Sequence, residues 1–220
     1  MGNVVQAIIW DFGGVLTTSP FEAFTRYEKA HGLPVDFIRS VNATEPDTNA
    51  WAQLERSEID AAEFDVLFQT ESRAFGHEIS GHDVLGLLSG ELRPRAIEAL
   101  KACKRSVKIG CITNNAPVGK GAGMTDDDAR ATEIANVFSL FDHVLESSRI
   151  GIRKPDPRIY ALMCEALDVE PANCIYLDDL GINLKPARAM GMTTIKVTSE
   201  MQLLEALGAE TGFDFTARAA

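Results

Sequence analysis

The chain has 220 residues, of which 45% are hydrophobic, and it carries 21 Lys and Arg against 32 Asp and Glu. A chain of this length and apolar content can bury a full core, and its formal net charge of -11 argues against nucleic acid or an anionic membrane surface as the main partner. Four cysteines without metal-ligand or redox-pair spacing, and a first apolar run that is short and interrupted by Asp11, predict a cytoplasmic protein with neither signal peptide nor membrane span.

The first predicted element is a buried strand that ends at an aspartate. The apolar residues 7–10 lead into Asp11, and Gly13 and Gly14 follow closely. Open α/β sheets place catalytic groups at the carboxyl ends of their strands, ahead of a glycine turn. Asp11 is therefore a candidate catalytic carboxylate, while a simple Asp-x-Gly turn is the alternative explanation.

Residues 18–90 show helical periodicity and no convincing strand. Ser19 followed by Pro20 is a helix start signal, and aromatic residues such as Phe21 then recur at helical spacing. Trp51 is expected to be a core residue of this segment. We interpret the segment as an insertion between the first strand and the rest of one sheet.

From residue 92 the pattern changes to alternating helices and strands. Predicted helices cover residues 94–103, 130–140, 156–167 and 184–190, and predicted strands cover residues 107–113, 143–146, 174–177 and 193–197. Strands separated by crossover helices form parallel sheets with helices on both faces. The predicted fold class is therefore α/β, a Rossmann-like parallel sheet with a helical insertion. Residues 1–17 and 91–220 form the predicted core domain, and residues 18–90 form the predicted cap.

Two further segments offer groups that suit a phosphate. Thr113, Asn114 and Asn115 bring a hydroxyl, amides and backbone N–H groups to a strand end. Lys154, fixed by the following Pro155, can neutralise charge between a carboxylate and a phosphate. A plain turn and a surface lysine are the respective alternatives. Three arginines near the lysine are interpreted as a solvated basic edge: Arg149, Arg153 and Arg158.

Two adjacent acids follow the strand predicted at residues 174–177. Asp178 and Asp179 repel each other unless a cation or a basic group lies beside them. Hard oxygen ligands with room for water suit Mg²⁺. The doublet therefore predicts a magnesium site, and it is the least turn-like of the polar signals.

Four polar signals follow one another, each at a strand end or a helix start: Asp11, Thr113-Asn114, Lys154-Pro155 and Asp178-Asp179. This ordered set resembles the haloacid dehalogenase (HAD) superfamily of Mg-dependent hydrolases, and the insertion looks like its C1 cap. Residues 176–192 are also similar to the phosphatase domain at the N-terminus of soluble epoxide hydrolases. The resemblance covers nearly the whole chain.

The resemblance implies a phosphatase that acts on a small phosphorylated metabolite through an aspartyl-phosphate on Asp11, with Lys154 balancing the charge. Asn183 would order the loop that carries the acids. The implied Mg²⁺ ligands are Asp11, the backbone carbonyl of Gly13, Asp179 directly and Asp178 through water. The implied phosphate ligands are Thr113, the amides of Asn114 and Asn115, and Lys154.

One position departs from the family pattern. Phosphatases of this family usually have a second aspartate two residues after the nucleophile, where it protonates the leaving oxygen, and this chain has Gly13 there. General acid catalysis contributes about 10²- to 10⁴-fold in rate, so we expect slow activity or a preference for activated phosphates. Four cap residues are candidates for the missing proton donor: His31, Glu22, Glu45 and Glu55.

Two alternatives stay open at this point. A 2-haloacid dehalogenase also lacks the second aspartate, but such enzymes work without metal, which would leave Asp178 and Asp179 uncompensated. A non-catalytic phosphate-ligand-binding homologue is the other alternative, and it leaves the retention of Asp11 and Lys154 unexplained. The sequence specifies neither the substrate nor an oligomeric state.

Overall fold

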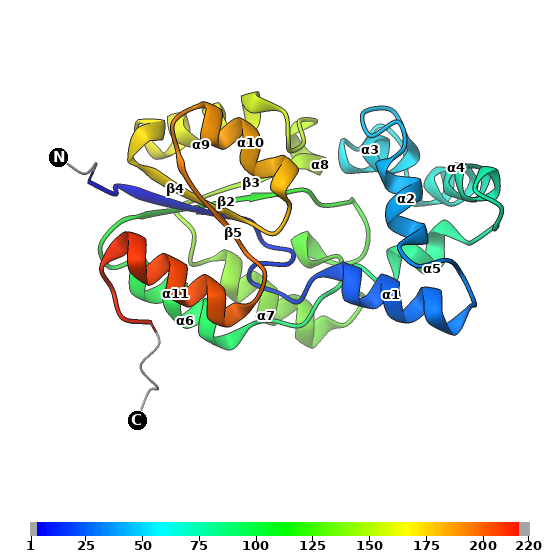
Figure 1. Cartoon of the computed structure of the whole chain (residues 1–220), viewed down its shortest axis with the longest axis horizontal. Helices are drawn as coiled ribbons and strands as arrows, with labels where there is room; N and C mark the ends of the chain where they lie inside the picture. The colour runs from blue at the N-terminus through cyan, green and yellow to red at the C-terminus, as the bar shows by residue number, and fades with distance from the viewer. Residues whose placement is uncertain (1–3, 216–220) are drawn as a thin grey trace.

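The computed structural model describes residues 4–215, and its centre is a five-stranded parallel sheet (Figure 1). The strands are β1 (Ala7–Trp10), β2 (Lys108–Thr113), β3 (His143–Glu146), β4 (Cys174–Asp178) and β5 (Thr193–Lys196). Their order is β3-β2-β1-β4-β5, and every neighbouring pair is parallel. The predicted α/β class with a parallel sheet is confirmed. Residues 1–3 and 216–220 of the predicted core domain lie outside the described residues.

Helices cover both faces of this sheet (Figure 1). One face carries α6 (Pro94–Cys103), α7 (Asp128–Phe138) and α11 (Glu200–Thr211), and the other carries α8 (Ser147–Ile150), α9 (Pro157–Leu167) and α10 (Gly181–Ala189). Two short 3₁₀ turns, η1 (Gly121–Gly123) and η2 (Pro171–Asn173), lie in connecting loops. Side chains alternate along β1, so Ile8 and Trp10 pack on the first face while Ala7 and Ile9 pack on the second.

Between β1 and α6 the chain forms five helices: α1 (Pro20–Ala30), α2 (Phe37–Ala43), α3 (Ala50–Glu55), α4 (Ala61–Ala74) and α5 (Gly81–Leu85). We call residues 18–90 the helical segment. It packs largely around its own hydrophobic cluster, which includes Phe24, Phe64 and Phe68. Ser19 caps the first of these helices, at the predicted start signal, since its hydroxyl accepts the N–H of Phe21.

The helical segment leaves and re-enters the sheet-bearing part of the molecule at adjacent points. The N–H of Thr18 donates to Glu91 O at 2.7 Å, and the N–H of Arg93 donates to Leu16 O at 2.8 Å. A Cβ at Gly90 would lie 2.3 Å from Thr18 O, so the two connections approach this closely only because that residue is glycine. These backbone hydrogen bonds hold the chain entering the helical segment beside the chain leaving it.

All four cysteines of the chain are buried free thiols, as predicted. Among residues 4–215, the helices are all too short or too polar to cross a bilayer.

Candidate active site

Asp11 lies at the carboxyl end of the central strand β1. Its backbone N–H donates to Leu177 O at 2.9 Å, which extends the pairing of β1 with β4 by one residue. The N–H of Phe12 donates to Asp11 Oδ1 at 2.7 Å. Burial raises the pKa of the Asp11 carboxyl well above its usual range, although the Lys154 ammonium acts in the opposite direction. An ionised Asp11 therefore needs positive charge beside it.

Three carboxylates meet at this edge of the sheet. Because β1 and β4 are neighbours, oxygens of Asp11, Asp178 and Asp179 all lie within 4.8 Å of one another. Burial, followed by the charge of Asp178, raises the pKa of Asp179 to about 6. Clustered carboxylates of this kind repel one another, and a bound cation removes that repulsion.

Lys154 joins the cluster from the loop before α9. Its Nζ lies 2.7 Å from Asp11 Oδ1 and 2.9 Å from Asp178 Oδ2, and it donates to Ile112 O at 3.0 Å. Burial lowers the pKa of this ammonium, but the carboxylates of Asp11 and Asp178 raise it further, so the net shift is upward and the group stays charged. Three carboxylates against one ammonium leave two formal negative charges, which one divalent cation balances.

Asp178 and Asp179 differ in how many hydrogen bonds their carboxylate oxygens already accept. Asp178 is fully buried, and its two oxygens accept hydrogen bonds from Lys154, the N–H of Leu180 at 2.7 Å, the amide of Asn183 at 3.1 Å and the hydroxyl of Tyr176. Asp179 Oδ2 accepts a hydrogen bond from the hydroxyl of Ser19 at 3.2 Å. Asp179 and Asp11 thus offer oxygens to a cation, while Asp178 is saturated. Oxygen donors of this kind fit Mg²⁺.

The two glycines after Asp11 have different reasons to be glycine. Gly14 has φ of +74°, and a Cβ there would lie 2.2 Å from Asp179 Oδ2, so a side chain would displace an acid of the cluster. A Cβ at Gly13 would meet nothing within 4 Å. A Cβ at Gly13 would therefore enter open space.

The three polar residues after β2 are placed differently. Thr113 and Asn114 line the cavity in front of Asp11, whereas Asn115 is buried behind it. The side chain of Asn114 holds the backbone of Lys154, accepting its N–H at 2.8 Å and donating to its O at 3.0 Å. The N–H of Asn115 donates to Ser147 Oγ at 3.1 Å, so this amide is engaged within the core. Asn115 therefore ties the end of β2 to α8, which differs from the phosphate contact expected from the sequence.

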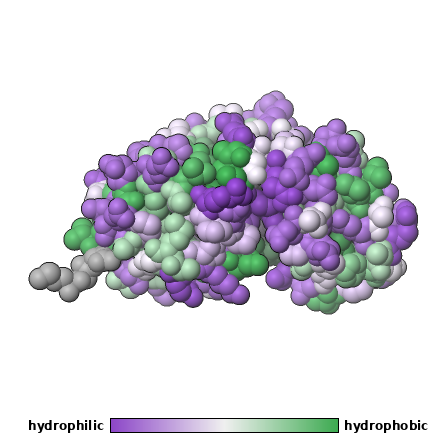
Figure 2. All heavy atoms as spheres, turned by 90° about the horizontal axis from the view of Figure 1, so that it is seen from above, coloured by the Kyte–Doolittle hydropathy of each residue, from purple (hydrophilic) through white to green (hydrophobic). Residues whose placement is uncertain are grey.

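A cavity of about 750 Å³ lies between this edge and the helical segment. Figure 2 shows an indentation on one side of the surface, between a larger part and a smaller part of the molecule. Asp11, Lys154 and Asp179 form part of the cavity wall on the core side. The remaining wall includes the aromatic and aliphatic residues Phe21, Phe24, Trp51, Leu54, Leu88 and Met124. It also includes polar residues of the helical segment, among them Asp36, Arg39, Ser40, Asn42 and Asp47. Trp51, expected in the core of the segment, thus also faces the cavity.

A family model for haloacid dehalogenase-like hydrolases matches residues 5–191. The chain belongs to this family. The match includes β1, the whole helical segment and the acidic doublet, so the cluster around Asp11 lies within the matched region. The resemblance expected from the order of the polar signals is confirmed at the level of the family.

This HAD-like hydrolase is 31% identical over 222 residues to bifunctional epoxide hydrolase 2 of Mus musculus, across 96% of this chain and 40% of that protein. It is 28% identical over 204 residues to phosphatase MT3486 of Mycobacterium tuberculosis, across 86% and 85% respectively. A solved HAD family enzyme of Bacteroides thetaiotaomicron, in complex with magnesium and inorganic phosphate, is 17% identical, with a TM-score of 0.57 over 89% of this chain and 96% of that one. The chain spans less than half the length of the first relatives it matches.

Glu55, at the end of α3, connects the helical segment to the carboxyl edge of the sheet. Its Oε2 accepts from Arg153 Nε at 2.6 Å and from Asn114 Nδ2 at 3.2 Å, while its Oε1 accepts from the indole of Trp51 at 2.9 Å. The interpretation of Arg153 as part of a solvated edge is wrong, because its side chain is only 18% exposed and is paired with this buried acid. The sequence gives no local signal for a partner 98 positions away.

The structure separates the four candidate proton donors of the helical segment. Glu55 lines the cavity, whereas His31, Glu22 and Glu45 do not. His31 is exposed and stacks on Tyr27 with ring centroids 3.9 Å apart. Glu55 accepts hydrogen bonds from the guanidinium of Arg153, the amide of Asn114 and the indole of Trp51, so both of its oxygens are already engaged by the protein. Of the four candidates, it is the one that lies at the site.

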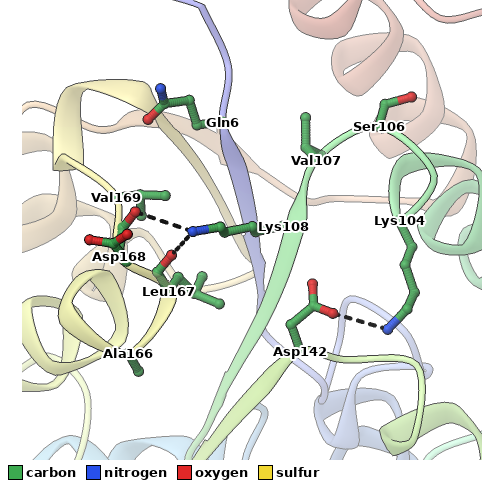
Figure 3. Close-up of a pocket in the computed structure, with 10 residues that line it drawn as sticks. All are labelled: Gln6, Lys104, Ser106, Val107, Lys108, Asp142, Ala166, Leu167, Asp168 and Val169. Carbon is green, nitrogen blue, oxygen red and sulfur yellow. Dashed lines mark hydrogen bonds and ion pairs between the residues drawn. The ribbon is translucent and has the colours of Figure 1, made fainter.

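A second hollow, of about 770 Å³, lies at the opposite end of the strands (Figure 3). Its two lysines are already engaged by the fold. Lys108 Nζ donates to Leu167 O at 2.5 Å and to Asp168 O at 3.3 Å, at the end of α9, and Lys104 Nζ lies 3.2 Å from Asp142 Oδ1. These contacts neutralise a helix end and an acid, so the hollow has a structural explanation.

Proposed function

We propose that this hydrolase is a Mg²⁺-dependent phosphatase that acts on small phosphorylated metabolites and uses Asp11 as its nucleophile. The observation that carries the proposal is the buried 2.7 Å contact between Lys154 Nζ and Asp11 Oδ1, beside Asp178 and Asp179. A phosphate dianion would be repelled by an acidic cluster alone, and a fixed ammonium with a cation site removes that barrier. The phosphatase name of one relative and the magnesium and phosphate bound to one structural neighbour support the proposal.

The reaction proceeds in two displacements at phosphorus. Asp11 attacks the phosphoryl group, its oxygen bonds to phosphorus, and the bond from phosphorus to the leaving oxygen breaks. The leaving oxygen takes a proton from water. A second water then attacks the aspartyl-phosphate, loses a proton to solvent and releases inorganic phosphate and the Asp11 carboxylate. Asp11, Asp179 and the Gly13 carbonyl would hold Mg²⁺, which would supply positive charge to the phosphoryl oxygens, while Asp178 would act through Lys154, which it shares with Asp11. Lys154 keeps its proton throughout and balances the charge on Asp11.

Gly13 limits the leaving groups that this site can expel. The residue provides no acid, and both oxygens of Glu55 are already engaged by Arg153, Asn114 and Trp51. A positioned general acid contributes about 10²- to 10⁴-fold in rate, and the loss is largest for alkoxides, which are the poorest leaving groups. Aryl and acyl phosphates, whose leaving groups need little protonation, are the favoured reactants.

The wall of the cavity indicates the body of the substrate. Phe21 and Phe24 of α1 and Trp51 and Leu54 of α3 line it from the helical segment. The aromatic and aliphatic part of the wall suits an apolar leaving group. Polar side chains of the same segment, Asp36, Arg39, Ser40, Asn42 and Asp47, also line the cavity and can bond polar groups of the substrate. We infer from the apolar part of the wall that the substrate is a phosphate monoester with an apolar body.

The proposal is tested by a phosphatase screen with Mg²⁺ and with EDTA, over aryl, acyl, long-chain alkyl and sugar phosphates. Asp11→Asn should abolish turnover, and EDTA should do the same to the wild-type protein. Asp128→Asn is a matched control, because that side chain is 89% exposed in the first turn of α7. Turnover that survives Asp11→Asn would refute the assigned nucleophile.

The same preparation tests the two alternatives. Release of chloride from 2-chloropropionate in the presence of EDTA would indicate a dehalogenase. Binding of inorganic phosphate without turnover of any phosphate ester would indicate a non-catalytic ligand-binding homologue. The buried acidic cluster disfavours the first outcome, since a metal-free site would leave two negative charges without a counter-ion.

A further inference from the structure

Behind the acidic cluster lies a pair of tyrosines to which the proposed reaction assigns no role. Tyr176 lies in β4 two residues before Asp178, on the same face of the strand, and Tyr160 belongs to α9. Both side chains are fully buried, and their rings meet edge to face with centroids 5.2 Å apart. Phenylalanine would fill the same space without burying a hydroxyl, so the two hydroxyls are the feature to be explained.

Each hydroxyl is bonded toward the loop that carries the acids. Tyr176 donates to Asp178 Oδ2, and Tyr160 donates to Asn183 O at 2.7 Å. The side-chain amide of Asn183 in turn donates to both oxygens of Asp178 at 3.1 Å. Asp178 is therefore held from its own strand and from α10, and α10 is held by α9.

Lys154 connects Asp178 to Asp11, the proposed nucleophile. Oδ2 of Asp178 accepts from the hydroxyl of Tyr176 and from Lys154 Nζ, the latter at 2.9 Å. The same ammonium lies 2.7 Å from Asp11 Oδ1. Hydrogen bonds to a carboxylate are short, strong and directional, so the hydroxyl fixes the direction in which Asp178 presents its charge.

We propose that Tyr176 is a positioning residue, whose hydroxyl orients Asp178 and, through Lys154, Asp11 for cation binding and attack on phosphorus. This inference rests on the proposed function. Removing an outer group that orients the residues around a metal site typically changes metal affinity or activity by about 10- to 100-fold. Asp178 keeps its bonds from Lys154, Leu180 and Asn183 without the hydroxyl, so the fold is retained and the orientation of the acid is what changes.

The test compares Tyr176→Phe with Tyr27→Phe. Tyr27 is a matched control because its hydroxyl also donates to an aspartate, Asp83 Oδ2 at 3.1 Å, but within the helical segment. Melting temperatures are measured over a Mg²⁺ titration, which reports cation affinity without turnover. Tyr176→Phe should weaken the apparent Mg²⁺ affinity about tenfold and lower kcat by a similar factor with KM little changed, while Tyr27→Phe should leave both unchanged.

A purely structural role gives a different result. It would lower the melting temperature of Tyr176→Phe equally with and without Mg²⁺ and leave affinity and kcat at wild-type values, which would overturn the inference. If Tyr176→Phe does not fold, Tyr160→Phe decides instead, with a loss of about twofold to fivefold in Mg²⁺ affinity expected and no loss contradicting the role. If the wild-type protein binds Mg²⁺ but hydrolyses no phosphate, the proposed function fails while the Mg²⁺ comparison still decides the role of Tyr176.

Discussion

The carboxyl edge of the sheet and the helical segment face each other across one cavity, and they contribute opposite kinds of surface. The edge buries Asp11, Asp178 and Lys154, and the ammonium of Lys154 pairs with both carboxylates. The helical segment contributes aromatic and aliphatic side chains, and its Glu55 bonds to the edge. Under the proposed function, the edge supplies the chemistry and the segment selects the leaving group. Removal of a charged group from the edge should therefore affect all substrates alike, addition of a proton donor to the edge should favour the poor leaving groups, and changes in the segment should affect substrates according to their shape.

Lys154→Met should have the largest effect. It leaves the carboxylates of Asp11 and Asp178 without their ammonium, so turnover should fall about 10²- to 10³-fold on every phosphate ester. Breaking a buried ion pair should also lower the free energy of unfolding by about 3 kcal/mol. Initial rates on aryl and alkyl phosphates and urea unfolding provide the measurement. Lys101→Met is the control, since its pair with Glu98 is exposed. A loss confined to one class of ester would contradict the assignment of chemistry to the edge.

Gly14→Ala should come next. A Cβ at Gly14 would collide with Asp179 Oδ2, so we expect the apparent Mg²⁺ affinity to fall by about 10- to 100-fold. Gly13→Ala is the matched control, because its Cβ enters open space. Isothermal titration of Mg²⁺ distinguishes them. Equal affinities in the two variants would show that Asp179 can move away without loss of the site.

Gly13→Asp should add to the edge an acid that can protonate the leaving group. A Cβ at this position enters open space, so turnover of alkyl phosphates should rise about 10- to 100-fold. Acetyl phosphate, whose leaving group needs no proton, should respond little. The ratio of kcat/KM for the two substrates is the measurement, with Gly13→Asn as a control of similar shape. An equal gain on both substrates would reject the missing-acid explanation.

The pKa of Asp179 predicts a pH dependence of stability. Burial and Asp178 raise this pKa to about 6 from an ordinary value of 3.8, so between these values the folded protein binds a proton that the unfolded chain releases. Without metal, the resulting stability is present at pH 4 and is lost as the pH rises through 6, on the order of 2 kcal/mol. Mg²⁺ binds the ionised form and should offset the loss. Melting curves from pH 4 to 8 test this, and Asp179→Asn should flatten the profile.

Glu55→Gln should have the smallest effect, and this effect should differ from one substrate to another. It weakens the 2.6 Å contact with Arg153 that joins α3 to the catalytic edge. We expect KM to rise a few-fold, by about 1 kcal/mol, with different factors for different esters and little change in kcat. Glu58→Gln is the control, because its partner Arg56 belongs to the same segment. A uniform fall in kcat would instead assign Glu55 to the chemistry.

The edge of the sheet was predictable from local patterns. Asp11 and Asp178 each close an apolar run that matches a strand, and parallel strands bring such ends together. Helix boundaries were less predictable. α10 begins at Gly181, three residues before the predicted start, because the turn after the acids folds directly into the helix and carries little apolar periodicity. No prediction covered α11, although Ser199 caps it.

The contacts across the cavity were not predictable from the sequence. Glu55 and Arg153 lie on separate elements, and their pairing depends on where the helical segment settles against the sheet. The engagement of the Asn115 amide by Ser147 likewise depends on tertiary packing of α8. Tyr176 carried a usable signal, because residues two apart in a strand share a face and its hydroxyl therefore had to lie beside Asp178.

Ser19 takes part in both regions at once. Its hydroxyl accepts the first free N–H of α1, from Phe21 at 3.4 Å, and donates to Asp179 Oδ2 at 3.2 Å. A change in the hydrogen bond from Ser19 to Asp179 therefore also affects the cap that Ser19 forms on α1. By thermodynamic reciprocity, if cation binding at Asp179 changes the stability of the start of α1, the conformation of α1 changes the cation affinity by the same free energy. The Ser19 hydroxyl thus connects the acidic cluster directly to the first helix of the helical segment.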